Sequence, residues 1–383
     1  MQFVKSMVRN YIFLCTSSIA LLALTVTCVA QSPASDSKSP SSAPSVAPAQ
    51  SAAGAARKDS QRPNIPGLDP KTMIPLYETI QEDWSSLEIG TSKLEPQPPM
   101  VGAVDEQPNF TRVMTRVQWR PGDPIDLWIF LPKGVKQPPV VLYLYGPDPT
   151  SRFRDNAWAE RVTSGGFAAV AFYPALTGPR FHDRPMKQWL ISEFQEALGS
   201  TVHDVKFILD YLDKSGHFDM NRVGMFGEGV GGTIAILSAA ADPRIKAVDA
   251  LEPWGDWPDF MAQSPVVELD PSHADYITPE FLKKIAPLDP VKWLPELKTP
   301  LRIQQVRESD ETPIKCKEAV SAAAPKQAEV VHFAGLTDMS KRESGGRLFE
   351  WMKDRLHPPA GRGTDAKVAA VEKTADSRTQ AQK

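Results

Sequence analysis

The chain has 383 residues, 42% of them hydrophobic, and a formal net charge of −3 at pH 7. This length is sufficient for one large domain or two small ones, and a near-neutral charge without any block of Lys and Arg gives no indication of a nucleic-acid partner. The 36 prolines include a dense group before residue 75, which sets the N-terminal part apart from the remainder.

The first thirty residues have the features of an export signal. Lys5 and Arg9 provide a positive start, residues 11–27 are mostly apolar, and Cys28 begins a small-x-small pattern that permits cleavage after Ala30. We therefore predict an exported protein, periplasmic or secreted, that keeps no membrane span after cleavage. Lipid anchoring through Cys28 is the alternative destination.

The segment 31–75 consists, as far as about Pro66, mainly of Ser, Ala, Pro and Gln, with almost no large apolar side chains. Such a segment cannot bury enough surface to offset its ordering entropy, so we predict a disordered linker. Residues 358–383 are predicted to be a similar tail. The folded domain is expected at residues 76–357, with 76–108 as an N-terminal extension. Cys316 is the one cysteine beyond the signal, so we expect no intramolecular disulfide and a buried thiol.

Strand and helix signals alternate through the domain. The predicted strands are 111–120, 125–131, 139–145, 167–173, 223–226, 245–251, 301–306 and 329–333, and the predicted helices are 186–212, 233–241, 313–324 and 343–356. Several of the strands are continuous apolar runs, which suit a sheet covered on both faces. The predicted fold class is α/β, a three-layer α/β/α sandwich. Its central sheet has about eight mostly parallel strands, and the first two form an antiparallel hairpin at its edge.

A glycine-rich segment follows the fifth predicted strand, between that strand and a predicted helix. Gly227, Gly229 and Gly231 have the spacing of a nucleophile elbow, Gly-x-Ser-x-Gly, with glycine at the position of the serine. A dinucleotide-binding motif is disfavoured because Glu228 would place negative charge beside the phosphate, and because the segment does not follow the first strand. A P-loop is excluded because no Gly-Lys-Ser/Thr follows. No cofactor is expected.

With this motif and this order of elements, residues 117–356 resemble the α/β-hydrolase superfamily, most of all its dienelactone-hydrolase and prolyl-oligopeptidase (peptidase S9) branches. The family order of catalytic residues is nucleophile, acid and histidine. The resemblance places the nucleophile position at Gly229, the acid at Asp310 and the histidine position at Asp338. It therefore implies a degenerate triad that lacks both serine and histidine.

Other residues are candidates for the pocket through their positions in this fold. The backbone N–H groups of Val230 and Gly146 are the expected oxyanion donors, and Pro147 has no N–H to offer. Glu228 is interpreted as a capping or loop-binding group at the entrance to the helix. His182 stands in a loop that can border the pocket. The paired His and Asp residues near it lack a third ligand, so no metal site is expected.

Trp254 and Trp257 stand in an aromatic segment after the sixth predicted strand, where this fold often inserts lids. They either pack on the core or form an apolar or carbohydrate-facing wall above the pocket. Together the residues predict an exported, non-catalytic hydrolase homologue that binds a small molecule, a peptide or a partner. The alternative is an active esterase or peptidase that uses non-standard side chains, such as Ser309 beside Asp310.

Overall fold

The computed structural model describes residues 82–88, 90, 92, 94–120, 123–145, 150–180, 190–343 and 347–356. The predicted signal with Cys28, the predicted linker and the predicted tail lie outside the described residues. Gly146 and His182, two of the pocket candidates, lie outside them as well.

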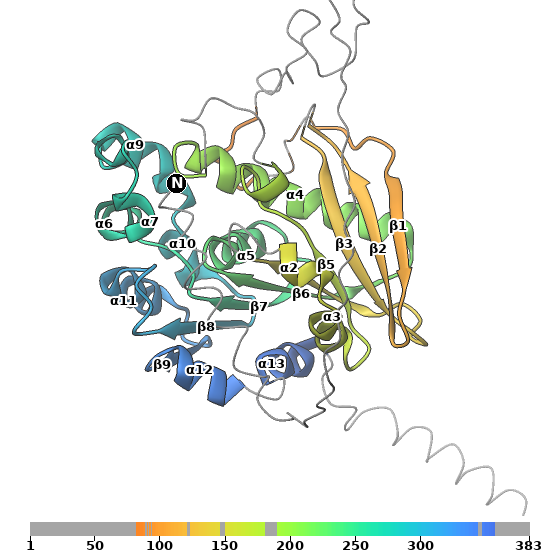
Figure 1. The fold of residues 1–383 in the computed structure, drawn as a ribbon. Helices are drawn as coiled ribbons and strands as arrows, with labels where there is room; N and C mark the ends of the chain where they lie inside the picture. Colours follow the sequence, from red (N-terminus) through yellow and green to blue (C-terminus); the bar gives the residue numbers. More distant parts are fainter. Residues whose placement is uncertain are drawn as a thin grey trace, which may run out of the picture. The chain divides into compact units, whose positions relative to one another are not determined.

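Within the described residues, nine strands form one sheet in the order β1-β2-β3-β5-β4-β6-β7-β8-β9 (Figure 1). The strands are β1 (Met100–Glu106), β2 (Phe110–Val117), β3 (Ile125–Pro132), β4 (Pro139–Leu144), β5 (Ala168–Ala171), β6 (Asp219–Glu228), β7 (Ile245–Leu251), β8 (Leu301–Val306) and β9 (Glu329–Phe333). Neighbours among β4 to β9 pair in parallel, and β1, β2 and β3 are joined antiparallel. The fold class and the antiparallel edge predicted from the sequence are confirmed.

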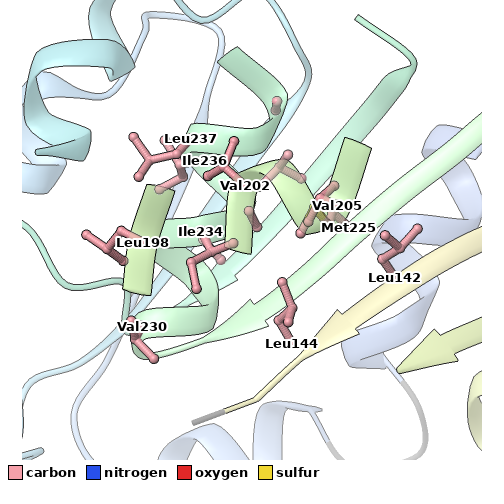
Figure 2. Packing of buried hydrophobic residues seen from close by; sticks show 14 of the residues in the cluster. Leu142, Leu144, Leu198, Val202, Val205, Met225, Val230, Ile234, Ile236 and Leu237 are labelled. Atoms are coloured by element: carbon pink, nitrogen blue, oxygen red, sulfur yellow. The ribbon is translucent and has the colours of Figure 1, made fainter. Parts of the chain in front are cut away.

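Helices cover both faces of the sheet. Helices α4 (Phe194–Ser215) and α5 (Val230–Ala241) pack on one face, and α3 (Asn156–Thr163) and α13 (Arg347–Leu356) pack on the other. Successive side chains of a strand point to opposite faces. Leu142 and Leu144 of β4 accordingly pack under α4 and α5 (Figure 2), whereas Val141 and Tyr143 belong to the cluster under α3 and α13. Burial on both faces explains why β4 is apolar throughout.

Several elements differ from the sequence expectation, among them one strand and two helices. Strand β1 was not predicted, because its seven residues are almost all exposed and show no apolar alternation. The helix expected at 186–212 begins at Phe194, since residues 190–193 form a turn, and it runs on to Ser215. The helix expected at 343–356 is replaced by α12 (Leu336–Glu343) and α13.

Between β7 and β8 the chain forms a group of short helices beside α4 and α5 (Figure 1). These are α6 (Trp257–Gln263), α7 (Pro265–Glu268), α8 (His273–Tyr276), α9 (Pro279–Ile285) and α10 (Pro290–Trp293), with the 3-10 turns η4 (Ala286–Leu288) and η5 (Leu294–Glu296). Proline stands in the first turn of α7, α9 and α10, where its missing N–H costs nothing.

The remaining described helices are α2 (Thr150–Arg154), η3 (Gly178–Arg180) and α11 (Ile314–Ala323). Cys316 of α11 is a free, buried cysteine, as expected, and burial raises the pKa of its thiol to about 12, which makes it unreactive near neutral pH. In the part of the chain that the structure describes, no helix has the length and apolar character to cross a membrane.

Candidate functional site

The strand-to-helix turn at Gly229 has the conformation that a nucleophile elbow requires. Gly229 follows β6 directly and has φ of 59° and ψ of −125°, a combination in which other residues are strained. Its N–H donates to the Leu251 carbonyl at 2.9 Å, and its own carbonyl accepts from the N–H groups of Gly232 and Thr233. The turn is thereby held from β7 on one side and from α5 on the other.

The flanking glycines are required by packing, and Gly229 is not. A Cβ added at Gly227 would overlap the Gly231 carbonyl, and one added at Gly231 would overlap the Leu144 carbonyl. A Cβ at Gly229 would meet only the Trp254 indole, with its closest atom, Nε1, at 3.4 Å, which is ordinary contact. The strand and helix therefore exclude side chains beside the elbow but leave space for one at its centre.

Trp254 is buried against this space. Its ring is 1% exposed and lies 4.8 Å from the Phe260 ring, centroid to centroid, and its carbonyl accepts a hydrogen bond from the Thr233 hydroxyl at 2.7 Å. Among the described residues, the indole Nε1–H has no hydrogen-bond partner. The Val230 N–H belongs to the first turn of α5, where backbone N–H groups have no partner within the helix. The Trp254 Nε1–H is therefore a donor beside the side-chain position of Gly229, and the Val230 N–H is the next backbone donor along the chain.

Trp257 also packs in the core, but its atoms are not among those nearest to a Cβ at Gly229. It is fully buried in the same cluster as Trp254, with its ring edge-on to Phe194 at 4.8 Å between centroids. Of the two interpretations left open by the sequence, core packing therefore describes both tryptophans. Trp254 additionally presents its Nε1 to the elbow.

Glu228 binds a neighbouring helix and does not cap α5. Its carboxylate forms an ion pair with Arg152 of α2, with 3.3 Å between Oε2 and Nη1, and Arg152 lies over the ring of Tyr145. The N-cap position of α5 is Gly229 itself, and no side chain caps the helix. Of the two roles expected for Glu228, capping is not supported by the contacts, and its carboxylate binds the helix α2 where a loop was expected.

Glu252 is a buried carboxylate that the sequence analysis missed. It follows β7 directly, has a φ of 50°, and accepts a hydrogen bond from the Val306 N–H at 2.5 Å. Lys317 of α11 pairs with it at 3.1 Å and also donates to the Ser309 carbonyl. Burial raises the pKa of Glu252 despite these partners. Its position directly after a predicted parallel strand, where sites in α/β sheets form, is the signal that could have identified it.

Glu311 is the second missed carboxylate. It lies in the loop between β8 and α11, and its carbonyl accepts a hydrogen bond from the Ser264 hydroxyl at 2.7 Å. Burial, with the nearby carboxylates of Glu228 and Glu252, raises the pKa of Glu311 to about 7, while Lys317 acts in the opposite direction. Glu228 is the last residue of β6, Glu252 follows β7 and Glu311 lies in the loop after β8, and the charges of the first two raise the pKa of the third.

The two other positions that the resemblance assigned to the triad are Asp310 and Asp338. Asp310 is exposed in the loop beside Glu311. Asp338 lies in the first turn of α12, accepts a hydrogen bond from the Ala334 N–H at 3.0 Å and faces Arg342 of its own helix. Its carboxylate therefore stabilises the start of α12. Ser309, the alternative nucleophile, is hydrogen-bonded to the carboxylate of Glu252.

The described histidines have other environments. His203 is buried beside Trp84 and Glu82, and burial lowers its pKa. His273 bonds to the Met261 carbonyl at 2.8 Å, and His332 is exposed on β9. Among the described residues, no cluster of three or more His, Cys, Asp or Glu side chains has an arrangement that could hold a metal ion.

Comparison with known proteins supports the fold. No family model matches the sequence. The quorum-quenching protein AidA of Acinetobacter baumannii is 27% identical over 143 residues, which are 37% of this chain and 44% of AidA. The hydrolyase poxO of Penicillium oxalicum is 31% identical over 142 residues, which are 35% of this chain and 31% of poxO. The chain thus spans less than half the length of these curated relatives.

Three solved structures are similar over most of the described part. An acetyl xylan esterase from Paenibacillus sp. R4 has a TM-score of 0.55 at 19% identity and covers 71% of this chain and 93% of its own. Acetyl xylan esterase 1 from Thermoanaerobacterium has a TM-score of 0.53 at 15% identity, and the match covers 70% of this chain and 92% of the esterase. An acylaminoacyl peptidase of Pyrococcus horikoshii has a TM-score of 0.51 at 16% identity, and the match covers 68% of this chain and 44% of the peptidase. This chain has the α/β-hydrolase fold, as the elbow motif predicted.

Proposed function

We propose that this chain is an exported, non-catalytic α/β-hydrolase-fold protein that binds a small-molecule or peptide ligand above Gly229. The observation that carries the proposal is the residue at the centre of the elbow. The turn keeps its strained backbone and its small flanking residues, yet Gly229 has no side chain with which to attack a carbonyl. Because a side chain would fit there, packing alone does not account for the glycine.

The groups that remain favour binding over reaction. Acyl transfer needs a nucleophile beside a base, and the position expected for the base is occupied by Asp338, which is engaged at the start of α12. The donors of Trp254 and Val230 require no nucleophile in order to hold a carbonyl or carboxylate oxygen. A ligand can therefore be held where the fold's substrates would be cleaved.

Labelling with an activity-based fluorophosphonate tests this proposal. We expect the purified full-length protein to show no adduct by intact-protein mass spectrometry, because the elbow offers no serine hydroxyl to phosphonylate. A serine hydrolase treated in parallel serves as the positive control. A stoichiometric adduct on one serine would contradict the proposal. Loss of that adduct in Ser309→Ala would favour an active hydrolase instead.

Export has its own test. Expression with an intact secretion system is expected to give a mature chain that begins at Gln31, since the pattern ending at Ala30 suits signal peptidase. The N-terminus and mass of the exported protein measure this directly. A chain that begins at Cys28 with added lipid mass would show anchoring, and an uncleaved chain retained in the cytoplasm would contradict export.

A further inference from the structure

Strand β1 leaves one edge of the sheet open. Among the described residues β2 is its only neighbour, and its other edge forms the right-hand border of the sheet in Figure 1. The backbone N–H and C=O groups along such an edge can pair with a further strand, which proteins commonly prevent with Lys or Pro in the edge strand or with a covering element. The sequence of β1, MVGAVDE, contains neither residue, and six of its seven residues are exposed. This edge is therefore available for pairing.

The exposed side chains of β1 include a contiguous apolar group. Met100, Val101 and Val104 are 61%, 66% and 56% exposed, and they make up three of the eight large hydrophobic side chains that are exposed in the described part of the chain. Single exposed apolar residues are normal, whereas a contiguous group marks a surface that binds another molecule. An apolar group on an unpaired strand edge points to a partner that adds a strand.

A β-bulge places the two valines of this group on one face of the sheet. Val101 lies opposite Thr115 of β2, Val104 lies opposite Val113, and the register shifts between the two pairs. The two β2 residues are two positions apart and share a face, so the two valines share it as well, although residues three apart in a regular strand point to opposite faces. Val113 packs against the core cluster under α4 and α5. The valines therefore extend this apolar face to the edge of the sheet.

We propose that β1 is the interface of a homodimer, in which the β1 strands of two copies pair antiparallel about a twofold axis between Gly102 and Ala103. A twofold interface requires a surface that is complementary to itself, and residues at equal distances from the axis lie opposite each other. Val101 of each copy accordingly lies opposite Val104 of the partner subunit. Opposite residues of antiparallel strands point to the same face, and the bulge satisfies this condition for both valines. This inference is independent of the proposed function.

The same register brings opposite charges together on the other face of the sheet. Asp105 of the partner subunit lies opposite Met100, whose neighbour on β2 is Arg116. The side chains of Asp105 and Arg116 are 43% and 46% exposed, so both can gain a contact although each already has an ion-pair partner within its chain. A hollow lined in part by Met100 and Arg116 leaves room for the incoming carboxylate. The interface thus joins valine to valine and acid to base.

Other registers of the same two strands lose this match. With the axis at Val104, Val101 would lie opposite Glu106 of the partner subunit, an apolar side chain against a charged one. With the axis at Asp105, the two copies of this carboxylate would face each other, and like charges in directly opposite positions are destabilising. The axis between Gly102 and Ala103 therefore satisfies both faces. A second copy supplies the matching side chains from its own sequence, which favours it over an unrelated strand as the partner.

Sedimentation velocity of the full-length protein tests the association. Stable complexes bury about 1,200–2,000 Å² in total, and a strand of seven residues is a short interface, so we expect a weak dimer. The weight-average mass should rise from that of a monomer toward twice that value between about 1 and about 300 µM, which corresponds to a dissociation constant on the order of 30 µM. A mass that stays monomeric over this range would overturn the proposal.

Lysine substitutions locate the interface. Val104→Lys places a charge in the edge strand and should weaken dimerisation at least about tenfold. Val135→Lys changes another exposed valine, which lies between β3 and β4, and should leave the dissociation constant unchanged. Circular dichroism and thermal melting verify that both variants are folded. A Val104→Lys variant that dimerises as tightly as the wild type would overturn the assignment of the interface to β1.

A mixture of charge-reversed variants tests the register. Asp105→Lys and Arg116→Glu each place like charges at both ends of the paired strands, so each variant alone should dimerise at least about fivefold more weakly than the wild type. In an equimolar mixture both ends of the heterodimer join opposite charges, so its affinity should return to about the wild-type value. Damage to the fold of either variant would not be repaired by mixing. A mixture that associates no better than the separate variants would overturn this register.

Cross-linking at the axis tests the arrangement most locally. Ala103→Cys places one thiol of each copy beside the twofold axis, where a short bismaleimide can join them. The wild type, with its own three cysteines, and Val135→Cys measure the background. We expect Ala103→Cys to form covalent dimers at least about tenfold faster than either control, because the effective concentration of paired thiols is high. Peptide mapping should show position 103 joined to itself. A rate no greater than that of Val135→Cys would overturn the proposal.

Discussion

Replacing Asp204 with alanine is expected to lower the free energy of unfolding by about 3–5 kcal/mol, because it leaves two buried guanidinium groups with a single carboxylate between them. Asp204 of α4 is fully buried and accepts hydrogen bonds from Arg120, Arg180 and the Trp119 indole at distances of 2.8–3.1 Å. Asp123 also binds both arginines, but one carboxylate cannot neutralise both. This network connects the end of β2 and the segment after β5 to α4.

Urea unfolding followed by circular dichroism measures this loss. The matched control is Asp210→Ala on the same helix, which removes a partly exposed partner of Lys206 and Arg244. Exposed pairs contribute about 0–1 kcal/mol, so the control should remain close to wild type. Similar losses of unfolding free energy in the two variants would show that the buried network stabilises the fold no more than a partly exposed ion pair does.

Gly231→Ala is expected to cost more than about 4 kcal/mol, or to prevent folding, because the added Cβ would overlap the carbonyl of Leu144. Neither partner can move easily. Leu144 is the last residue of β4, which is paired on both sides in the middle of the sheet, and Gly231 is held in the first turn of α5. Thermal melting and soluble yield report the effect.

Gly229→Ala is the matched variant, two residues away in the same elbow. Its Cβ meets only the indole of Trp254 at contact distance, so the expected cost is the backbone strain of a positive φ, about 1–3 kcal/mol. A loss as severe as that of Gly231→Ala would mean that packing demands glycine at the centre of the elbow. The missing nucleophile would then be a structural requirement of this chain and no longer evidence about its function.

Much of the sheet could be predicted because each of these strands is marked by an apolar run within one short segment of the sequence. The strands at 245–251, 301–306 and 329–333 agree with β7, β8 and β9, and β4 differs by one residue. Strand β1 could not be predicted, since its mostly exposed side chains give no apolar pattern and its pairing with β2 depends on tertiary structure. Residues 190–193 continue the apolar spacing of α4 but form a turn, because burial of Leu190 and Ile191 does not require helical backbone.

The elbow of the candidate site could be predicted from the sequence, and the group of three carboxylates could not, because only the elbow is a local motif. The elbow is a local motif, so the position of Gly229 between β6 and α5 follows from neighbouring residues alone. Glu228, Glu252 and Glu311 come from the ends of three strands, and their proximity depends on the order of β6, β7 and β8 in the sheet. The loop conformation that exposes Asp310 and half-buries Glu311 cannot be deduced from their sequence positions.

The most direct test of the central claim is a crystal structure of the full-length protein grown with a short alkyl amide such as butanamide. The account predicts an intact amide above Gly229, with its carbonyl oxygen within hydrogen-bond distance of the Trp254 Nε1. A cleaved probe, a covalent adduct on the chain, or an amide bound elsewhere with nothing above Gly229 would contradict it.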